Sequence, residues 1–162
     1  MFELIDAQWN QMYGTSLPRQ RFFIPTNAFW EKLKVLSSDF DMIIDCGTGS
    51  GDLPKEAVGH KIKMAGVDII HRDGNGPCEV QVIPAHRMPY SSRIWALVCR
   101  PNHSGWCPAL QSQAADSGAG FIYVSKPDRI EDDVSLDLNL PDDLILNVGE
   151  DGESMLVWLP RK

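Results

Sequence analysis

The feature that most constrains this chain is a short apolar run that leads into a loop with glycine at every second position. Residues 42–44 are apolar without alternation, which is typical of a strand covered on both faces. Asp45 follows at the carboxyl end of that strand, and Gly47, Gly49 and Gly51 come next. Glycine lets the backbone turn tightly and lets a ligand approach the main chain, because no Cβ blocks it. Ligands of open α/β sheets bind beyond the carboxyl ends of the strands, so this stretch predicts a fold and a pocket together.

A second predicted strand, residues 63–70, carries an acidic side chain near its end. This residue, Asp68, lies about as far past the glycines as a ribose-binding carboxylate needs to lie. Its two oxygens can accept hydrogen bonds from both ribose hydroxyls. The alternative is an ordinary acidic turn residue, but the spacing and the preceding strand favour the ribose-binding interpretation.

The motif over residues 45–51, Asp-Cys-Gly-Thr-Gly-Ser-Gly, resembles the glycine-rich loop of class I S-adenosylmethionine-dependent methyltransferases. It fits the dinucleotide fingerprint G-x-G-x-x-G less well, because Asp52 stands in place of the third glycine. A glycine-rich loop also occurs as an ordinary tight turn, and the resemblance is strengthened by the strand that follows, which carries an acidic residue near its end. The resemblance implies an α/β fold of three layers, Rossmann-like, with a mostly parallel sheet and a C-terminal antiparallel hairpin.

The resemblance also implies a cofactor, S-adenosylmethionine, and a set of binding residues. In the family, the end of the strand predicted at residues 79–83 meets the adenine ring, commonly with an acidic residue before an alanine-like one. Here Pro84 precedes Ala85, so adenine recognition is expected from the main chain or from His86. His86 is otherwise an exposed loop residue. The expected cofactor-binding residues are Asp45, Cys46, Gly47, Thr48, Gly49, Gly51, Asp68, Ile69, Ala85, His86 and Arg100.

The strand predicted at residues 94–99 leads into the loop that faces the transferred methyl group in the family. This loop begins Arg-Pro-Asn-His and lacks the Asp/Asn-Pro-Pro-aromatic motif of amino-methylating members. Asn102 would orient a nucleophile, and His103 would act as general base at neutral pH. Arg100 would pair with an acidic substrate or with the cofactor carboxylate. The alternative is structural: His103 and Ser104 then cap the next helix.

The remaining pattern predicts one methyltransferase-like domain over residues 1–162, with an N-terminal helix and strap at 1–25 and a core at 26–162. The strap is expected to pack on the core, and a lid over the pocket is the alternative. Helices are predicted at 3–13, 26–36, 52–58 and 106–117, further strands at 121–125, 144–148 and 154–159, and a loop at 71–77. The Asp-Gly pair between the last two strands predicts a hairpin.

Composition narrows the range of functions. The chain has 162 residues, 43% of them hydrophobic, and a net charge of -7, which argues against a protein that chiefly grips nucleic acid through phosphates. Its four cysteines form no C-x-x-C pair, so neither a metal site nor a disulfide framework is expected. The acidic segment 126–143 is interpreted as a solvated loop. No membrane span and no secretory signal are expected, and a reduced cytoplasmic setting is the simplest account.

The sequence therefore favours a minimal methyltransferase that moves the activated methyl group of S-adenosylmethionine to a small molecule or a protein. Such a transfer needs mainly positioning, so the acceptor and the oligomeric state cannot be read from the chain. The alternative is a methyltransferase-like binding or regulatory module that has lost catalysis. A nicotinamide enzyme fits less well, because the glycine spacing differs and no second substrate domain is present.

Overall fold

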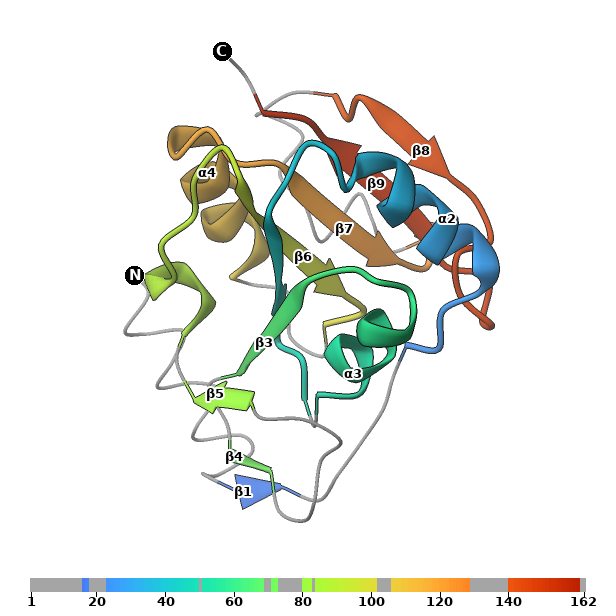
Figure 1. Ribbon diagram of the computed structural model, residues 1–162, viewed down its shortest axis with the longest axis horizontal. Helices are drawn as coiled ribbons and strands as arrows, with labels where there is room; N and C mark the ends of the chain where they lie inside the picture. The colour runs from blue at the N-terminus through green and yellow to red at the C-terminus, as the bar shows by residue number, and fades with distance from the viewer. Residues whose placement is uncertain are drawn as a thin grey trace.

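The computed structural model describes residues 16–17, 23–49, 51–68, 71–72, 80–82, 84–101, 106–128 and 140–160. Their main feature is a seven-stranded sheet, seen in Figure 1. Its strands, in spatial order, are β5 (Val80–Val82), β3 (Met64–Asp68), β2 (Met42–Cys46), β6 (Ile94–Cys99), β7 (Phe121–Ser125), β9 (Ser154–Trp158) and β8 (Asp143–Ile145).

The first five strands in this spatial order are parallel, and the last two pairings are antiparallel. β9 follows β8 in the chain but lies between β7 and β8, with Tyr123 of β7 opposite Leu156. The predicted C-terminal hairpin and the mostly parallel sheet are confirmed. The strand order reverses at β2, which pairs with β3 on one side and with β6 on the other.

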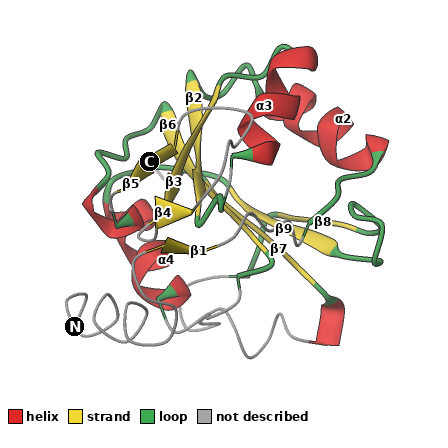
Figure 2. Ribbon diagram, turned by 90° about the horizontal axis from the view of Figure 1, so that it is seen from below, coloured by secondary structure: helices red, strands yellow, loops and turns green. Residues whose placement is uncertain are grey.

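Helices cover both faces of the sheet. α2 (Asn27–Leu36) and α3 (Asp52–Gly59) lie on one face, and α4 (Cys107–Asp116) with the short 3₁₀ helix η1 (Ala85–Arg87) lies on the other, as Figures 1 and 2 show. This gives the three layers expected from the sequence.

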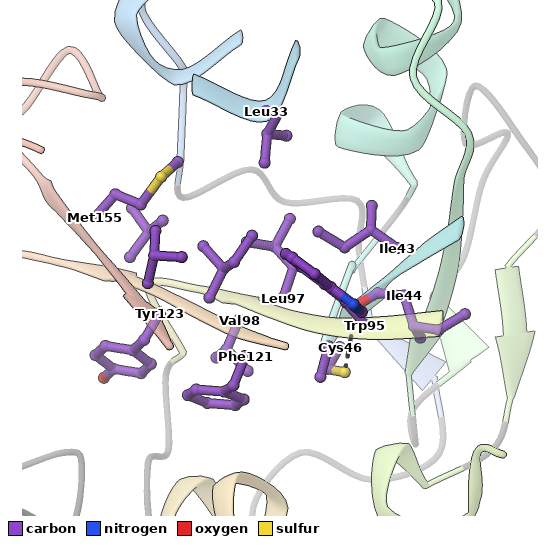
Figure 3. Packing of buried hydrophobic residues seen from close by; sticks show 14 of the residues in the cluster. Leu33, Ile43, Ile44, Cys46, Trp95, Leu97, Val98, Phe121, Tyr123 and Met155 are labelled. Atoms are coloured by element: carbon purple, nitrogen blue, oxygen red, sulfur yellow. Dashed lines mark hydrogen bonds between the residues drawn. The ribbon is translucent and has the colours of Figure 1, made fainter. Parts of the chain in front are cut away.

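Both sheet faces are buried, which explains the absence of alternation in residues 42–44. Ile43, Leu97 and Met155 point toward α2 and α3, whereas Phe121 and Tyr123 point toward α4 (Figure 3). All five side chains are at most 2% exposed. A parallel strand covered on both faces has no solvent side, so its sequence carries apolar residues at successive positions.

α2 forms as predicted, and its N-cap residue is bonded to a distant part of the chain. Phe29, Leu33 and Leu36 are buried on one face of the helix. Thr26 occupies the N-cap position without capping the helix through its side chain. Its hydroxyl instead donates to the carbonyl oxygen of Asn147 at 2.7 Å. The start of α2 is therefore fixed to the turn between β8 and β9.

The pattern of residues 106–117 predicts Ala109, Leu110 and Ala114 on the inner face of α4, with Gln113 as a further candidate, and this face needs correction. Leu110 and Ala114 are buried as expected, but Ala109 and Gln113 are only half-buried. Cys107 and Gln111 lie on the buried face instead. These four buried residues, at positions 107, 110, 111 and 114, form a single helical stripe. The helix is therefore rotated about its axis relative to the predicted orientation. The prediction had placed an alanine where the structure places a glutamine.

One element was missed. β1 (Ser16–Leu17) pairs in parallel with β4 (His71–Arg72), forming a separate two-stranded sheet. The prediction of a loop over residues 71–77 is therefore wrong at its first two positions, because backbone pairing with a distant segment leaves little trace in local composition. The predicted helix at 3–13 lies outside the described residues, as does most of the acidic segment. No helix among the described residues is long and apolar enough to cross a membrane.

Candidate functional site at the carboxyl edge of the sheet

The site lies where the strand order reverses. β2, β3 and β6 are parallel, so their carboxyl ends meet at one edge of the sheet. Asp45 and Cys46 end β2, and Asp68 ends β3. Open α/β sheets bind ligands at such a reversal, because the loops there leave the sheet in opposite directions and open a crevice.

The three glycines of the loop, where the sequence predicts a tight turn, adopt the left-handed conformation. Their φ angles are 73° at Gly47, 68° at Gly49 and 85° at Gly51. An L-residue with a Cβ rarely adopts this conformation, so glycine is required at these positions. The amides of Gly47 and Thr48 donate to the carbonyl oxygen of Val67 at 2.9 and 3.0 Å, which anchors the loop to β3.

Asp68 holds the tip of this loop. Its Oδ2 accepts a hydrogen bond from the Gly49 amide at 2.8 Å, and its side chain is buried, at 4% exposure. The structure thus joins two residues that sequence reasoning had assigned to one pocket. Thr48 packs on β3 just behind them: a Cβ on Gly66 would lie 2.7 Å from Thr48 Cγ2. Gly66 is therefore needed for the close approach of loop and strand.

Asp45 is a buried acid at the base of the loop, at 3% exposure. Burial raises the pKa of its carboxyl to about 7; the nearby Thr48 side chain opposes the rise, and the charge of Asp68 adds to it. Thr48 Oγ1 is buried close to this carboxyl, although it makes no hydrogen bond of ordinary geometry to another described residue. A cationic ligand group placed beside Asp45 would favour its ionised form.

Cys46 and Ala85, both expected near the cofactor, are linked by a tyrosine that sequence reasoning missed. Tyr90 donates its hydroxyl to the carbonyl oxygen of Ala85 at 2.8 Å, and its Oη lies 3.1 Å from Cys46 Sγ. Burial raises the pKa of the Cys46 thiol to about 12 and also raises that of Tyr90. Both groups are neutral at physiological pH and tie the end of β2 to η1. No local pattern around Tyr90 indicates this role.

The structure places Arg100 against the turn that precedes β9. Its Nη1 donates to Asp151 Oδ2 at 2.8 Å and to Glu153 Oε2 at 3.3 Å, so the side chain reaches across the end of β7. Glu153 is only 1% exposed. Arg100 also has a φ of 43°, which is unusual for a residue other than glycine. These ion pairs give the guanidinium a structural partner that the sequence did not indicate.

Trp106 is a second residue that the sequence did not assign to the pocket. Its indole atoms Cζ2 and Cη2 lie 3.6 and 3.8 Å from the position that a Cβ of Gly47 would take. An aromatic ring at the start of α4 therefore borders the glycine-rich loop.

Several predicted residues lie outside the described part of the chain. They are Ile69, Asn102 and His103, and the side chain of His86 is likewise not described. Their roles stay predictions. Within the described ranges, no group of three His, Cys, Asp or Glu side chains could hold a metal ion.

The chain is similar to several solved structures. One is described as "Putative methyltransferase yhhF from Escherichia coli": it has a TM-score of 0.53 and 16% sequence identity, over 90% of this chain and 92% of that one. A mutant of the 16S rRNA (adenine(1408)-N(1))-methyltransferase from Catenulisporales acidiphilia has a TM-score of 0.48 and 14% identity, over 82% and 93% of the two chains. A third is the 1,6-didemethyltoxoflavin-N1-methyltransferase of Burkholderia thailandensis, with a TM-score of 0.45 and 10% identity, over 83% and 60%.

No protein-family model and no curated protein matches the chain. At this level of identity the similarity to the E. coli structure shows the fold. The expected methyltransferase-like α/β fold, with a mostly parallel sheet and a C-terminal antiparallel hairpin, is thereby confirmed.

Proposed function

We propose that this protein binds S-adenosylmethionine at the loop after β2 and transfers its methyl group to an acceptor. The observation that carries the proposal is the 2.8 Å hydrogen bond from the Gly49 amide to the Asp68 carboxylate, made at the point where the strand order reverses. It brings a left-handed glycine loop and a buried acid into one site. Backbone that a ligand can approach and a ribose-binding carboxylate are the two components such a cofactor needs.

Each part of the site has a separate proposed task. Asp68 accepts hydrogen bonds from the ribose hydroxyls while it keeps Gly49 in place. The amides at the start of α3 face the cofactor carboxylate, since a helix N-terminus favours an anion. Asp45 lies beside the cationic part of the methionine group. The remaining proposed cofactor contacts are Cys46, Gly47, Thr48, Gly51, Ile69, Ala85 and His86.

When bound, S-adenosylmethionine supplies an activated methyl group to a nucleophile in line with its sulfonium. The chain's own residues hold the reactants at this edge and exclude water, which accounts for much of the rate of such a displacement. Asn102 and His103 are proposed to orient the acceptor and take its proton. The net charge of -7 favours a small-molecule or protein acceptor over nucleic acid.

Calorimetric titration with S-adenosylmethionine and S-adenosylhomocysteine tests the proposal. We expect micromolar binding that weakens at least about tenfold in Asp68→Asn, because the amide loses a charged acceptor for the ribose. Asp41→Asn is the matched control: Asp41 precedes β2 at the opposite edge and pairs with Arg93 at 2.7 Å. Its affinity should be unchanged.

No heat with either ligand, for a protein that circular dichroism shows to be folded, would contradict the proposal. The alternative of a binding module without catalysis would then be favoured. Equal weakening in both variants would show that the effect does not arise from the ribose site.

A further inference from the structure

Trp106 borders the glycine-rich loop. Two atoms of its benzo ring, Cζ2 and Cη2, lie 3.6 and 3.8 Å from the position that a Cβ of Gly47 would take. The residue is half-buried and packs on the hydrophobic core.

The helix that follows fixes the position of this ring. Trp106 is the N-cap residue of α4, and its carbonyl oxygen accepts the Leu110 amide at 3.1 Å. Cys107 and Leu110 are fully buried. A ring attached to such an anchored turn offers contact area with little loss of conformational entropy on binding.

The charges around the site indicate which part of a ligand lies beside Trp106. Under the proposed function the ribose lies at Asp68, so the rest of the cofactor extends from there in two directions. Toward β5 the chain continues into η1, where Arg87 is an exposed cation. Toward β2 and β6 lie the buried Asp45 and the Trp106 ring. Arg100 also follows β6, but its guanidinium is paired with Asp151 and Glu153. A cation is favoured by a carboxyl group and by an aromatic face, and disfavoured by an arginine.

We propose that Trp106 recognises the sulfonium of the cofactor through its aromatic face, and so determines how well the site distinguishes the charged methyl donor from its neutral product. This inference rests on the proposed function and adds to it a specificity residue at the β6 side of the loop. The recognition is electrostatic, because a ring quadrupole attracts a cation and does not attract a neutral thioether in the same way.

The test compares affinities for S-adenosylmethionine and S-adenosylhomocysteine by calorimetry. In Trp106→Leu we expect the ratio of the donor Kd to the product Kd to rise at least about threefold, with the product Kd nearly unchanged. Trp106→Phe should give a smaller rise, because phenylalanine keeps a weaker aromatic face. Trp30→Phe is the control, since Trp30 stacks on His60 at the far end of α3 with a centroid distance of 4.3 Å.

A second set of variants keeps the shape of the ring. Site-specific replacement of Trp106 by tryptophans with increasingly fluorinated benzo rings weakens the negative face with little change in size. We expect the ratio of dissociation constants to rise stepwise with fluorination, and this holds as a test even if Trp106→Leu fails to fold.

The outcomes separate the two proposals. Product binding by the unsubstituted protein together with a constant ratio in the fluorinated series would overturn the role of Trp106 alone. Absence of binding of both ligands to the folded, unsubstituted protein would overturn the proposed function and this inference with it.

Discussion

Asp45 should make the stability of this protein depend on pH in an unusual direction. Its carboxyl is buried, and its pKa is raised from 3.8 to about 7. The folded state therefore holds this proton more tightly than the unfolded state does. The contribution of Asp45 to stability is full below about pH 4, falls as the pH rises, and is lost above about pH 7.

The size of the effect follows from the shift. About three pKa units, at about 1.4 kcal/mol each, amount to about 4 kcal/mol over the whole range. Between pH 5 and pH 8 the free energy of unfolding should fall by about 3 kcal/mol, because part of the interval between the two pKa values lies below pH 5. This is a large fraction of the 5–15 kcal/mol that typically stabilises a domain.

The assay is urea unfolding of the natural protein and of Asp45→Asn, followed by circular dichroism at pH 5, 6, 7 and 8. The asparagine cannot ionise, so the difference between the two free energies of unfolding isolates this one group. We expect the natural protein to lose about 3 kcal/mol relative to the variant as the pH rises. Asp41→Asn is the control, since Arg93 holds the pKa of the exposed Asp41 below its ordinary value and it stays ionised throughout.

A difference between the natural protein and Asp45→Asn that stays constant from pH 5 to pH 8 would refute this reasoning. It would mean that the carboxyl is solvated or ionised in the folded state despite its burial. Ligand binding gives an independent test of the same pKa. A cation bound beside Asp45 should lower the pKa of its carboxyl and release protons near pH 7. Calorimetric titration in buffers of different ionisation enthalpy detects this proton release.

Three further predictions test the packing around the site. Gly66→Ala places a Cβ 2.7 Å from Thr48, so the free energy of unfolding by urea should fall by about 1–3 kcal/mol. An unchanged free energy would show that the loop relaxes freely. Gln111→Leu should raise the same free energy by about 1 kcal/mol, because both polar atoms of the buried amide have no partner among the described residues. A lower free energy of unfolding in this variant would show that the amide is used. Arg100→Gly should be about 1 kcal/mol more stable than Arg100→Ala, since the φ angle of Arg100 is 43°. Neither variant should change the Kd for S-adenosylhomocysteine more than about threefold, because Glu153 holds the guanidinium. A larger loss of affinity would make Arg100 a ligand contact.

The elements that form the site could be predicted from the sequence because their constraints are local. An apolar run without alternation indicates a strand buried on both faces, and β2 and β6 are such strands. Glycine at every second position indicates a tight turn, and Gly47, Gly49 and Gly51 have the positive φ angles that glycine allows in such a turn. The separation of Asp68 from the glycines predicted a ribose-binding acid near the loop. The hydrogen bond to Gly49 brings Asp68 to the loop, and its ribose-binding role stays a prediction.

The contacts that complete the site could not be predicted, because each depends on residues far apart in the chain. Tyr90 reaches Cys46 across 44 positions, and Arg100 reaches Glu153 across 53. No periodicity or motif in the sequence indicates either contact. In the sequence, Trp106 is only the first residue of a predicted helix. That its ring borders Gly47 follows from how α4 packs on the sheet. The same limit explains why the pairing of β1 with β4 was missed.

The position of β9 has a consequence for the order in which the chain can assemble. β8 is made before β9 but joins the sheet only through it, because β9 lies between β7 and β8. A nascent chain that has not yet reached Ser154 therefore exposes the edge of β7 and leaves β8 without a partner in the sheet. Until β9 inserts, the buried residues of β7 and the apolar strand edge are open to other chains, as in any unprotected edge. Synthesis that pauses before this strand should therefore favour aggregation or chaperone binding over folding.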